Sequence, residues 1–190
     1  CRIFGISYSV WNMFCDSLGN DIIGFASQKA VLFTGSIKSN IEFGREVNDE
    51  ELSEAIRISQ SENIVKEKEE GVDSPITQGG TNVSGGQKQR ISIARVLAKK
   101  KNIYIFDDTF SALDYATDKK LRAELSELIK KTNSTVIIVA QRISTIMNAD
   151  KILVLDEGKI VGEGKHADLL ENCEVYKQIA YSQLSKEELA

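Results

Sequence analysis

Three runs of consecutive apolar residues in the second half of the chain limit what it can fold into. They span residues 103–106, 136–139 and 152–155. Uninterrupted apolar runs of this length are typical of strands buried on both faces of a parallel sheet. The segment between the first two runs carries apolar residues at helical spacing: Leu121, Leu125, Leu128 and Ile129. A strand, a helix and a second strand in this order predict a βαβ unit and therefore an α/β fold.

The remaining segments predict the elements around this unit. The sequence favours a short strand over residues 22–26 and a helical segment over residues 36–68. A Gly-, Ser- and Thr-rich loop follows over residues 71–86, and a further helix over residues 86–99. After the third apolar run, Asp156-Glu157-Gly158 predicts a turn into a hairpin. The end of the chain predicts an amphipathic helix over residues 167–184.

Composition and charge exclude several classes of function. The 190 residues carry a net charge of −4, so the basic surface typical of nucleic-acid binding is missing. The three cysteines are far apart and form no CxxC pair, which argues against a disulfide framework or a zinc site. No apolar run approaches the ~18 residues that a membrane-spanning helix needs. Because the first residue is Cys1, we expect a fragment that lacks its natural start but has a true C-terminus.

The segment Val83-Ser84-Gly85-Gly86-Gln87 has the features of a phosphate-binding site. Two adjacent glycines leave backbone N–H groups uncovered at the predicted start of a helix, where the partial positive charge favours an anion. The hydroxyl of Ser84 adds a donor. The alternative is that Ser84 simply caps a helix that follows two glycines.

A second motif lies at the end of the first apolar run, which leads into Asp107 and Asp108. Ligands of open α/β sheets bind beyond the carboxyl ends of the strands. In P-loop NTPases an aspartate at such a place helps to hold Mg²⁺ on the phosphates. The alternative is an acidic strand end that is only solvated.

Together, the two motifs resemble the ATP-binding cassette (ABC) ATPase family. The segment around Gly85 is similar to the family's signature motif, residues 103–108 to its Walker B strand, and Ser111-Ala112-Leu113-Asp114 to its D-loop, in the family's order. Upstream, residues 28–41 resemble an exporter-type Q-loop. Downstream, residues 149–166 resemble the family's closing strands.

The resemblance implies a P-loop NTPase (RecA-like) core with an ABC helical subdomain, incomplete at the N-terminus. The expected parts are an unmatched N-terminal segment (1–17), the Q-loop region of the core (18–35), the helical subdomain with the signature motif (36–99), the RecA-like core with Walker B, D-loop and switch region (100–165), and the C-terminal helices (166–190).

Departures from the family pattern indicate a site that hydrolyses ATP poorly. The phosphate loop G-x-x-x-x-G-K-[ST] is absent, and because the family has this loop upstream of the Q-loop, we expect it to be cut off from this chain. Asp108 stands where the family has a catalytic Glu, and a carboxylate that falls back by about 1 Å can lose about 100-fold in rate, although a tolerated acidic exchange is the alternative. Gln141 stands at the switch His position and cannot carry a positive charge. Gln78 stands where such exporters often have a Glu, in a loop that is expected to contact the membrane domains. We interpret His166, the only histidine of the sequence, as structural.

In this family two cassettes sandwich two ATP molecules head to tail, so the resemblance distributes the residues of this chain over two sites. Gln28 and Asp107 would serve Mg²⁺ and water in the chain's own site, with Asp108 and Gln141 as weakened catalytic residues. The residues that would face the ATP held by the partner half are Ser84, Gly85, Gly86, Gln87 and Asp114.

The resemblance further implies an exporter domain at the cytoplasmic face of the cell membrane, with ATP and Mg²⁺ as cofactors. Its partners would be a second ABC half, in a heterodimer, and transmembrane domains whose coupling helices contact residues 36–99. The exported compound would be small and amphipathic, and the isolated fragment inactive. Two alternatives are a soluble ABC ATPase, disfavoured by the exporter-like residues 28–41 and the acidic balance, and a regulatory module that binds nucleotide without hydrolysing it.

Overall fold

The structure is a computed structural model that describes residues 22–184. The described residues form two compact units, 22–137 and 138–184. The expected N-terminal segment 1–17 lies outside the described residues.

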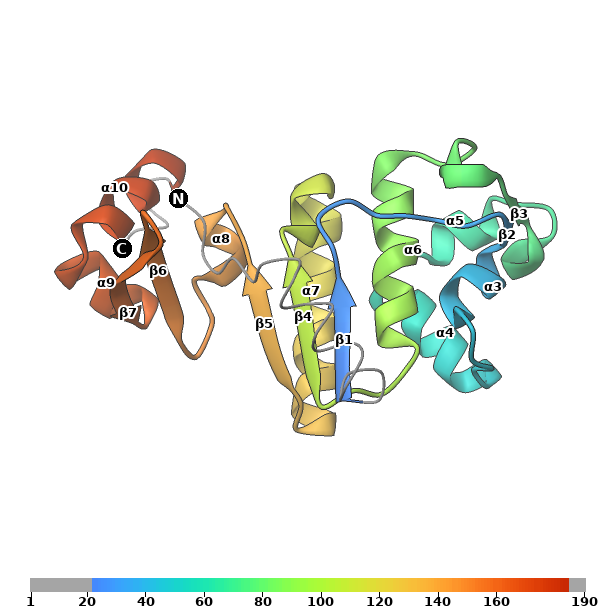
Figure 1. Cartoon of the computed structure of the whole chain (residues 1–190), viewed down its shortest axis with the longest axis horizontal. Coiled ribbons are helices and arrows are strands. Elements are labelled where there is room, and N and C mark those ends of the chain that lie inside the picture. The colour runs from blue at the N-terminus through green and yellow to red at the C-terminus, as the bar shows by residue number, and fades with distance from the viewer. Residues whose placement is uncertain (1–21, 185–190) are drawn as a thin grey trace. The chain divides into compact units, whose positions relative to one another are not determined.

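The first unit is built on a sheet with the strand order β1-β4-β5 (Figure 1). β1 (Ile23–Ala26) and β4 (Ile103–Asp107) are parallel, with Ile23 opposite Ile103 and Ala26 opposite Phe106. The α7 helix (Tyr115–Thr132) connects β4 to β5 (Thr135–Val139), which leads into the second unit. The predicted strand at 22–26 and the predicted order of strand, helix and strand are therefore confirmed.

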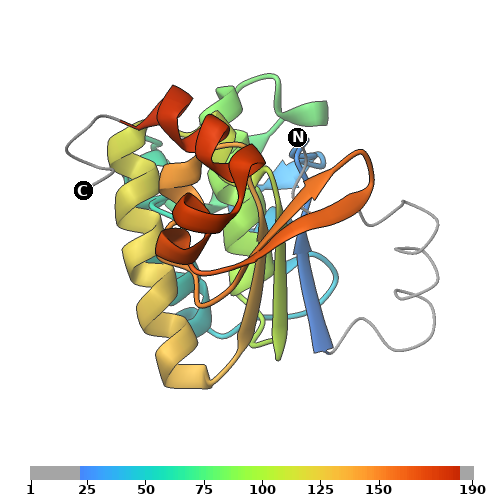
Figure 2. The same ribbon diagram turned by 90° about the vertical axis from the view of Figure 1, so that its left-hand side faces the viewer.

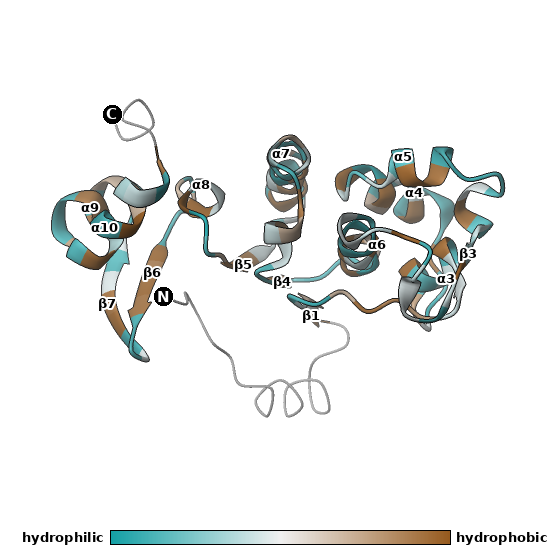
Figure 3. Cartoon of the chain, turned by 90° about the horizontal axis from the view of Figure 1, so that it is seen from above, coloured by the Kyte–Doolittle hydropathy of each residue, from teal (hydrophilic) through white to brown (hydrophobic). Residues whose placement is uncertain are grey.

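The two long helices of this unit lie on the same face of its sheet (Figure 3). α6 (Gly85–Leu97) packs against β1, and α7 runs along the sheet (Figure 2). Tyr104, Ile105 and Phe106 of β4 are buried, whereas β5 is exposed or half-buried along its length. The expectation of burial on both faces is therefore wrong for β5.

The segment 36–68, expected to be helical throughout, is divided into α3 (Ile37–Glu42), α4 (Asp49–Ile58) and α5 (Glu62–Lys66). Phe43 and Gln60 follow α3 and α4 with φ values of 38° and 58°. Residues in this left-handed region commonly end helices, because they turn the backbone away from the helix axis. The predicted loop contains the short strand β3 (Pro75–Ile76), which pairs with β2 (Gly35–Ser36), and two 3₁₀ turns, η1 (Gly71–Asp73) and η2 (Gln78–Gly80).

The second unit contains the predicted hairpin. β6 (Ile152–Asp156) pairs antiparallel with β7 (Lys159–Gly164). Glu157 and Gly158 both have positive φ in the turn, which matches the twist of a two-residue hairpin. In the described part of the chain β6 pairs with β7 and is not a member of the parallel sheet. The expectation that the third apolar run forms a strand of a parallel sheet is therefore wrong.

The predicted C-terminal helix is instead two helices, α9 (His166–Asn172) and α10 (Glu174–Gln183), which meet at an extended Cys173. With α8 (Ile143–Ile146) and β6 they enclose a core that includes the fully buried Tyr176. Nδ1 of His166 lies 2.7 Å from the Tyr176 hydroxyl. Burial lowers the pKa of His166 and raises the pKa of Tyr176 to about 12. This internal contact supports the interpretation of His166 as structural.

Gly24 leaves room for α6 to lie against β1, which suggests a first test. A Cβ at this position would lie 2.9 Å from Cγ1 of Val96. We expect Gly24→Ala to destabilise the first unit by about 1–3 kcal/mol, as overpacked cores do. The double variant Gly24→Ala/Val96→Ala should lose less stability than the sum of the two single losses, because removing Cγ1 of Val96 relieves the shortest of the contacts that the new methyl group makes. Hydrogen–deuterium exchange of α6 amides in the intact protein measures this, and additive losses in the double variant would contradict it.

Candidate functional site

The parallel register of β1 and β4 brings the residues that follow both strands to one edge of the sheet. Two buried side chains fix this edge. Oγ1 of Thr109 donates to the carbonyl of Ala26 at 3.1 Å, and Nε2 of Gln89, from α6, donates to the carbonyl of Ser27 at 3.2 Å. The carboxyl edge of a parallel sheet is where α/β proteins bind ligands, so this edge is the candidate site.

Asp108 and Gln28 are in direct contact at this edge. Nε2 of Gln28 donates to Oδ2 of Asp108 at 2.9 Å, although the two residues are 80 positions apart in the sequence. Asp108 is buried and has a left-handed backbone, with φ 46° and ψ 28°. Aspartate is one of the few residues that adopt this conformation readily, because its short side chain bonds locally. The structure thus brings together Gln28, which is predicted to serve Mg²⁺ and water, and Asp108, which is predicted to be a weakened catalytic residue.

Oxygen ligands for Mg²⁺ are present beside this contact. Asp107 ends β4 half-buried, and the amide of Gln28 has a carbonyl oxygen in addition to the nitrogen that binds Asp108. Mg²⁺ is held by one or two protein oxygens, with water and phosphate oxygens completing its shell. Among residues 22–184 no cluster of three or more His, Cys, Asp or Glu could hold a metal alone. The oxygens of Asp107 and Gln28 are of the kind that Mg²⁺ prefers, and they could supply part of its shell.

The signature segment forms the N-terminus of α6, and its side chains cap each other. Oγ of Ser84 accepts from the Gln87 N–H at 3.2 Å, and Oε1 of Gln87 accepts from the Ser84 N–H at 2.9 Å. Neither bond uses the N–H groups of Gly85 and Gly86. A Cβ at Gly85 would have no atom within 4 Å, whereas one at Gly86 would lie 3.4 Å from the carbonyl oxygen of Ala112. Ser84 therefore caps the helix, but this cap does not exclude a phosphate site. The N–H groups of the two glycines, which the cap does not use, suit a phosphate at the helix N-terminus.

The D-loop segment lies beside the signature. Ala112, whose carbonyl faces Gly86, ends the 3₁₀ turn η3 (Thr109–Ala112). Asp114 caps α7 and accepts the Thr117 N–H at 3.0 Å. This hydrogen bond lowers the pKa of the exposed Asp114 carboxyl. Asp114 therefore carries a negative charge at neutral pH, and in the sequence it lies two residues after Ala112, whose carbonyl faces Gly86.

Gln141 lies in the second unit, directly after Ala140 at the end of β5. Its side chain is exposed, and its carbonyl accepts from Nε2 of Gln183 at 2.8 Å. Gln28 and Asp108 belong to the first unit, and the contact between them does not include Gln141.

Comparisons with known proteins agree with this geometry. Residues 16–111 match the family model described as ABC transporter. An uncharacterized ABC transporter ATP-binding protein of Mycobacterium tuberculosis is 41% identical over 165 residues, which cover 85% of this chain and 28% of that protein. A protein of Rickettsia conorii with the provisional name of an export ATP-binding/permease protein is 41% identical over 165 residues, covering 86% of this chain and 28% of that protein. The solved structure of a bacterial Atm1-family ABC exporter with ATP bound has a TM-score of 0.81 and 33% identity, and the match covers 87% of this chain and 29% of that one.

The fold and the site define an α/β nucleotide-binding domain of the P-loop NTPase class. The chain belongs to the ABC transporter family and is an ABC ATP-binding domain homologous to export ATP-binding proteins. It spans 28% of the length of the curated relatives named above. Between residues 22 and 184, no helix is long and apolar enough to cross a membrane.

Sequence analysis missed the buried polar residues that hold the site together. Gln89 is 2% exposed and Thr109 is 0% exposed. The only signal for Gln89 is a polar residue on the apolar face of a predicted helix, which implies a buried hydrogen-bond partner. Thr109 directly follows the two acids and carries no signal of its own.

The capping geometry predicts different stability effects for two adjacent positions. Ser84→Ala should destabilise the first unit by about 1 kcal/mol, because the Gln87 N–H loses its acceptor. Gly85→Ala should not destabilise it, since the added methyl group meets open space and alanine favours a helix. Amide exchange of α6 in the intact protein would compare the two variants, and equal losses would mean that Gly85 is not open.

Proposed function

We propose that this chain is the ATP-binding domain of an exporter half whose own ATP site hydrolyses poorly, and whose signature completes the site of a partner half. The observation that carries the proposal is the contact between Gln28 and Asp108. In this contact the carboxylate of Asp108, which would be the shortened general base of the attacking water, accepts a hydrogen bond from the amide of Gln28.

The chain's own site lacks two groups that hydrolysis would use. A general base must reach the water, and Asp108 is one methylene shorter than the glutamate of the family's pattern. Gln141, at the expected switch position, can hydrogen-bond a phosphate but cannot provide a positive charge. Asp107 and Gln28 would still hold Mg²⁺, which neutralises charge on the phosphates when it is bound.

The signature serves the other site of the sandwich. The open N–H groups of Gly85 and Gly86, with the hydroxyl of Ser84, would donate to the phosphates of ATP held by the partner half. Gln87 supports them through the capping box, and Asp114 would lie across the same interface. A chain with a weak site of its own would thus remain necessary for turnover in its partner, which is why we propose a heterodimer.

An exposed aromatic surface supports attachment to transmembrane domains. The rings of Phe33 and Phe43 stack with centroids 5.1 Å apart, and the Arg95 guanidinium lies 4.9 Å from the Phe43 centroid. Both rings are about half exposed, and the connection from β1 toward α3 contains a short apolar stretch, residues 30–33 (Figure 3). Coupling helices of the membrane domains would bind here, placing the domain at the cytoplasmic face of the membrane. The exported compound would be small and amphipathic, and this chain alone, without a phosphate loop, would be inactive.

The first functional test compares Gly85 with Asp108 in the assembled transporter. Gly85→Asp should nearly abolish ATP turnover, because a carboxylate about 4 Å from the γ-phosphate repels it by about 4 kcal/mol at an effective dielectric near 20, roughly a 1000-fold effect. Asp108→Asn should be mild, since this position contributes little. Steady-state ATPase activity of the purified heterodimer measures both variants.

Gly85→Ala is the matched control, because it adds one uncharged methyl group at the same open position. It should fall between the wild type and Gly85→Asp. If Asp108→Asn is the more damaging change, this half is the working one and the two roles are reversed.

The second test restores the missing groups. Asp108→Glu combined with Gln141→His should raise hydrolysis at this half's site, measured with the partner's catalytic Glu disabled. Correct placement of a general base contributes about 10²–10⁴-fold, so partial recovery should be visible. Each single variant serves as a control for the pair. Activity that stays at background in the double variant would favour a module that binds nucleotide without hydrolysing it.

A further inference from the structure

Arg90 lies one helical turn after the signature glycines and connects them to a distant part of the first unit. Its Nε donates to the carbonyl of Gly86 at 3.4 Å, within α6. Its Nη1 donates to the carbonyl of Gln60 at 2.7 Å, beyond the end of α4. The side chain is half-buried, so one guanidinium joins two backbone carbonyls from different elements.

The Gln60 carbonyl is available because of how α4 ends. The N–H of Gln60 donates to the carbonyl of Arg57 at 3.0 Å, and the N–H of Ser61 donates to the carbonyl of Ile56 at 2.8 Å. This pair of bonds is a Schellman motif, in which the left-handed position is usually glycine. Here Gln60 occupies it, with φ 58°. The backbone reverses at this residue, and its carbonyl bonds to Arg90 instead of continuing the helix.

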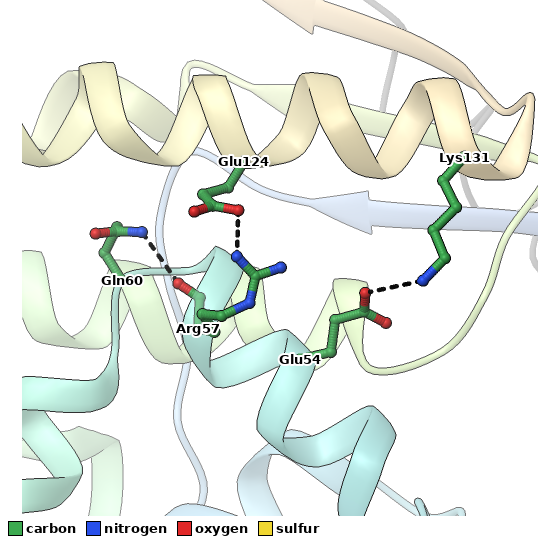
Figure 4. A network of polar contacts seen from close by, with 5 residues as sticks. All are labelled: Glu54, Arg57, Gln60, Glu124 and Lys131. Carbon is green, nitrogen blue, oxygen red and sulfur yellow. Dashed lines mark hydrogen bonds and ion pairs between the residues drawn. The ribbon is translucent and has the colours of Figure 1, made fainter.

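The end of α4 is itself fixed to α7 (Figure 4). Nε2 of Gln60 donates to the carbonyl of Arg57 at 3.0 Å, and the Arg57 guanidinium forms an ion pair with Glu124. A second ion pair joins Glu54 to Lys131 at 3.7 Å. Exposed ion pairs contribute little singly, but two of them on adjacent turns set the position of α4 along α7. Arg90 therefore connects the signature to an element that is anchored elsewhere.

Electrostatics favour the same arrangement. Burial lowers the pKa of Arg90, while the negative charges of Asp114 and Glu67 oppose this change. An arginine keeps its charge under such conditions, because its pKa starts far above neutrality. The guanidinium thus lies in the field of the D-loop residue Asp114.

We propose that Arg90 is a positioning residue for the signature. It holds the peptide between Gly86 and Gln87 at a fixed place relative to the end of α4, and so keeps the N–H groups of the glycines available to a phosphate. The inference rests on the proposed function, in which those groups bind ATP held by the partner half. Lysine cannot replace this arginine fully, because a single ammonium group lacks the planar fork that reaches two carbonyls at once.

The test uses the assembled full-length transporter with MgATP. Arg90→Met keeps the length of the side chain but removes its donors, and we expect kcat to fall about tenfold to 100-fold, the range that corresponds to losing a hydrogen bond of a charged group. The KM for MgATP should change much less, because the displaced groups act most strongly on the transition state. Arg90→Lys should recover part of the loss in kcat.

Arg122→Met is the matched control. Arg122 is also partly buried, and its Nε donates to the buried Asp118 at 3.0 Å within α7. This variant should lower the unfolding temperature without lowering kcat. A purely structural role of Arg90 would make Arg90→Met behave like Arg122→Met, with lower stability and normal kcat, and this result would overturn the inference. If Arg90→Met does not fold, a normal kcat in Arg90→Lys overturns it instead.

Gly85→Asp separates failure of this inference from failure of the proposed function. An inactive Gly85→Asp protein with a normal kcat in Arg90→Met would leave the proposed function intact and remove only the role of Arg90. Unchanged turnover in Gly85→Asp would overturn the proposed function, and the inference with it.

Discussion

The candidate site depends on the parallel register between β1 and β4. Because Ala26 lies opposite Phe106, the residues that follow the two strands emerge at one edge, and Gln28 reaches Asp108 across 80 positions of sequence. The buried bond from Thr109 to Ala26 prevents the strand ends from separating. A shift of the register by one residue would reverse the side chains of β1 and remove this contact. The chemistry of the edge is therefore fixed by backbone pairing.

The signature is held by local bonds rather than by the sheet. In this capping box the side chain of Ser84 accepts the Gln87 N–H, and the side chain of Gln87 accepts the Ser84 N–H. The N–H groups of Gly85 and Gly86, which lie between them, take no part in these two bonds. A larger residue at Gly86 would press against the carbonyl of Ala112, whereas Gly85 faces open space. The two glycines thus have different roles, one for packing against the D-loop and one for an open surface.

The sequence predicted those features that depend on local pattern. The apolar runs gave the strands β4, β5 and β6, and the spacing of Leu121, Leu125 and Leu128 gave α7. The sequence did not predict where the helices end, because Phe43, Gln60 and Cys173 are not residues that usually end helices. The pairing of β6 with β7 alone, and the half-burial of β5, depend on which elements lie beside each strand. Apolar composition does not encode these neighbours.

The candidate site shows the same limit. Gln28, Asp108 and the signature residues could be named from motifs, but the bond from Gln28 to Asp108 follows only from the register of two strands. The bonds of Gln89 and Arg90 likewise join residues 62 and 30 positions apart. The left-handed backbone at Asp108 adds a further reason why this acid is short. Aspartate tolerates this conformation better than glutamate, because its side chain can bond locally. A half whose partner carries out hydrolysis would lose little function by this exchange, while its backbone at the end of β4 becomes less strained. On the proposed function, folding would favour the shortened acid at a position where catalysis would no longer oppose it.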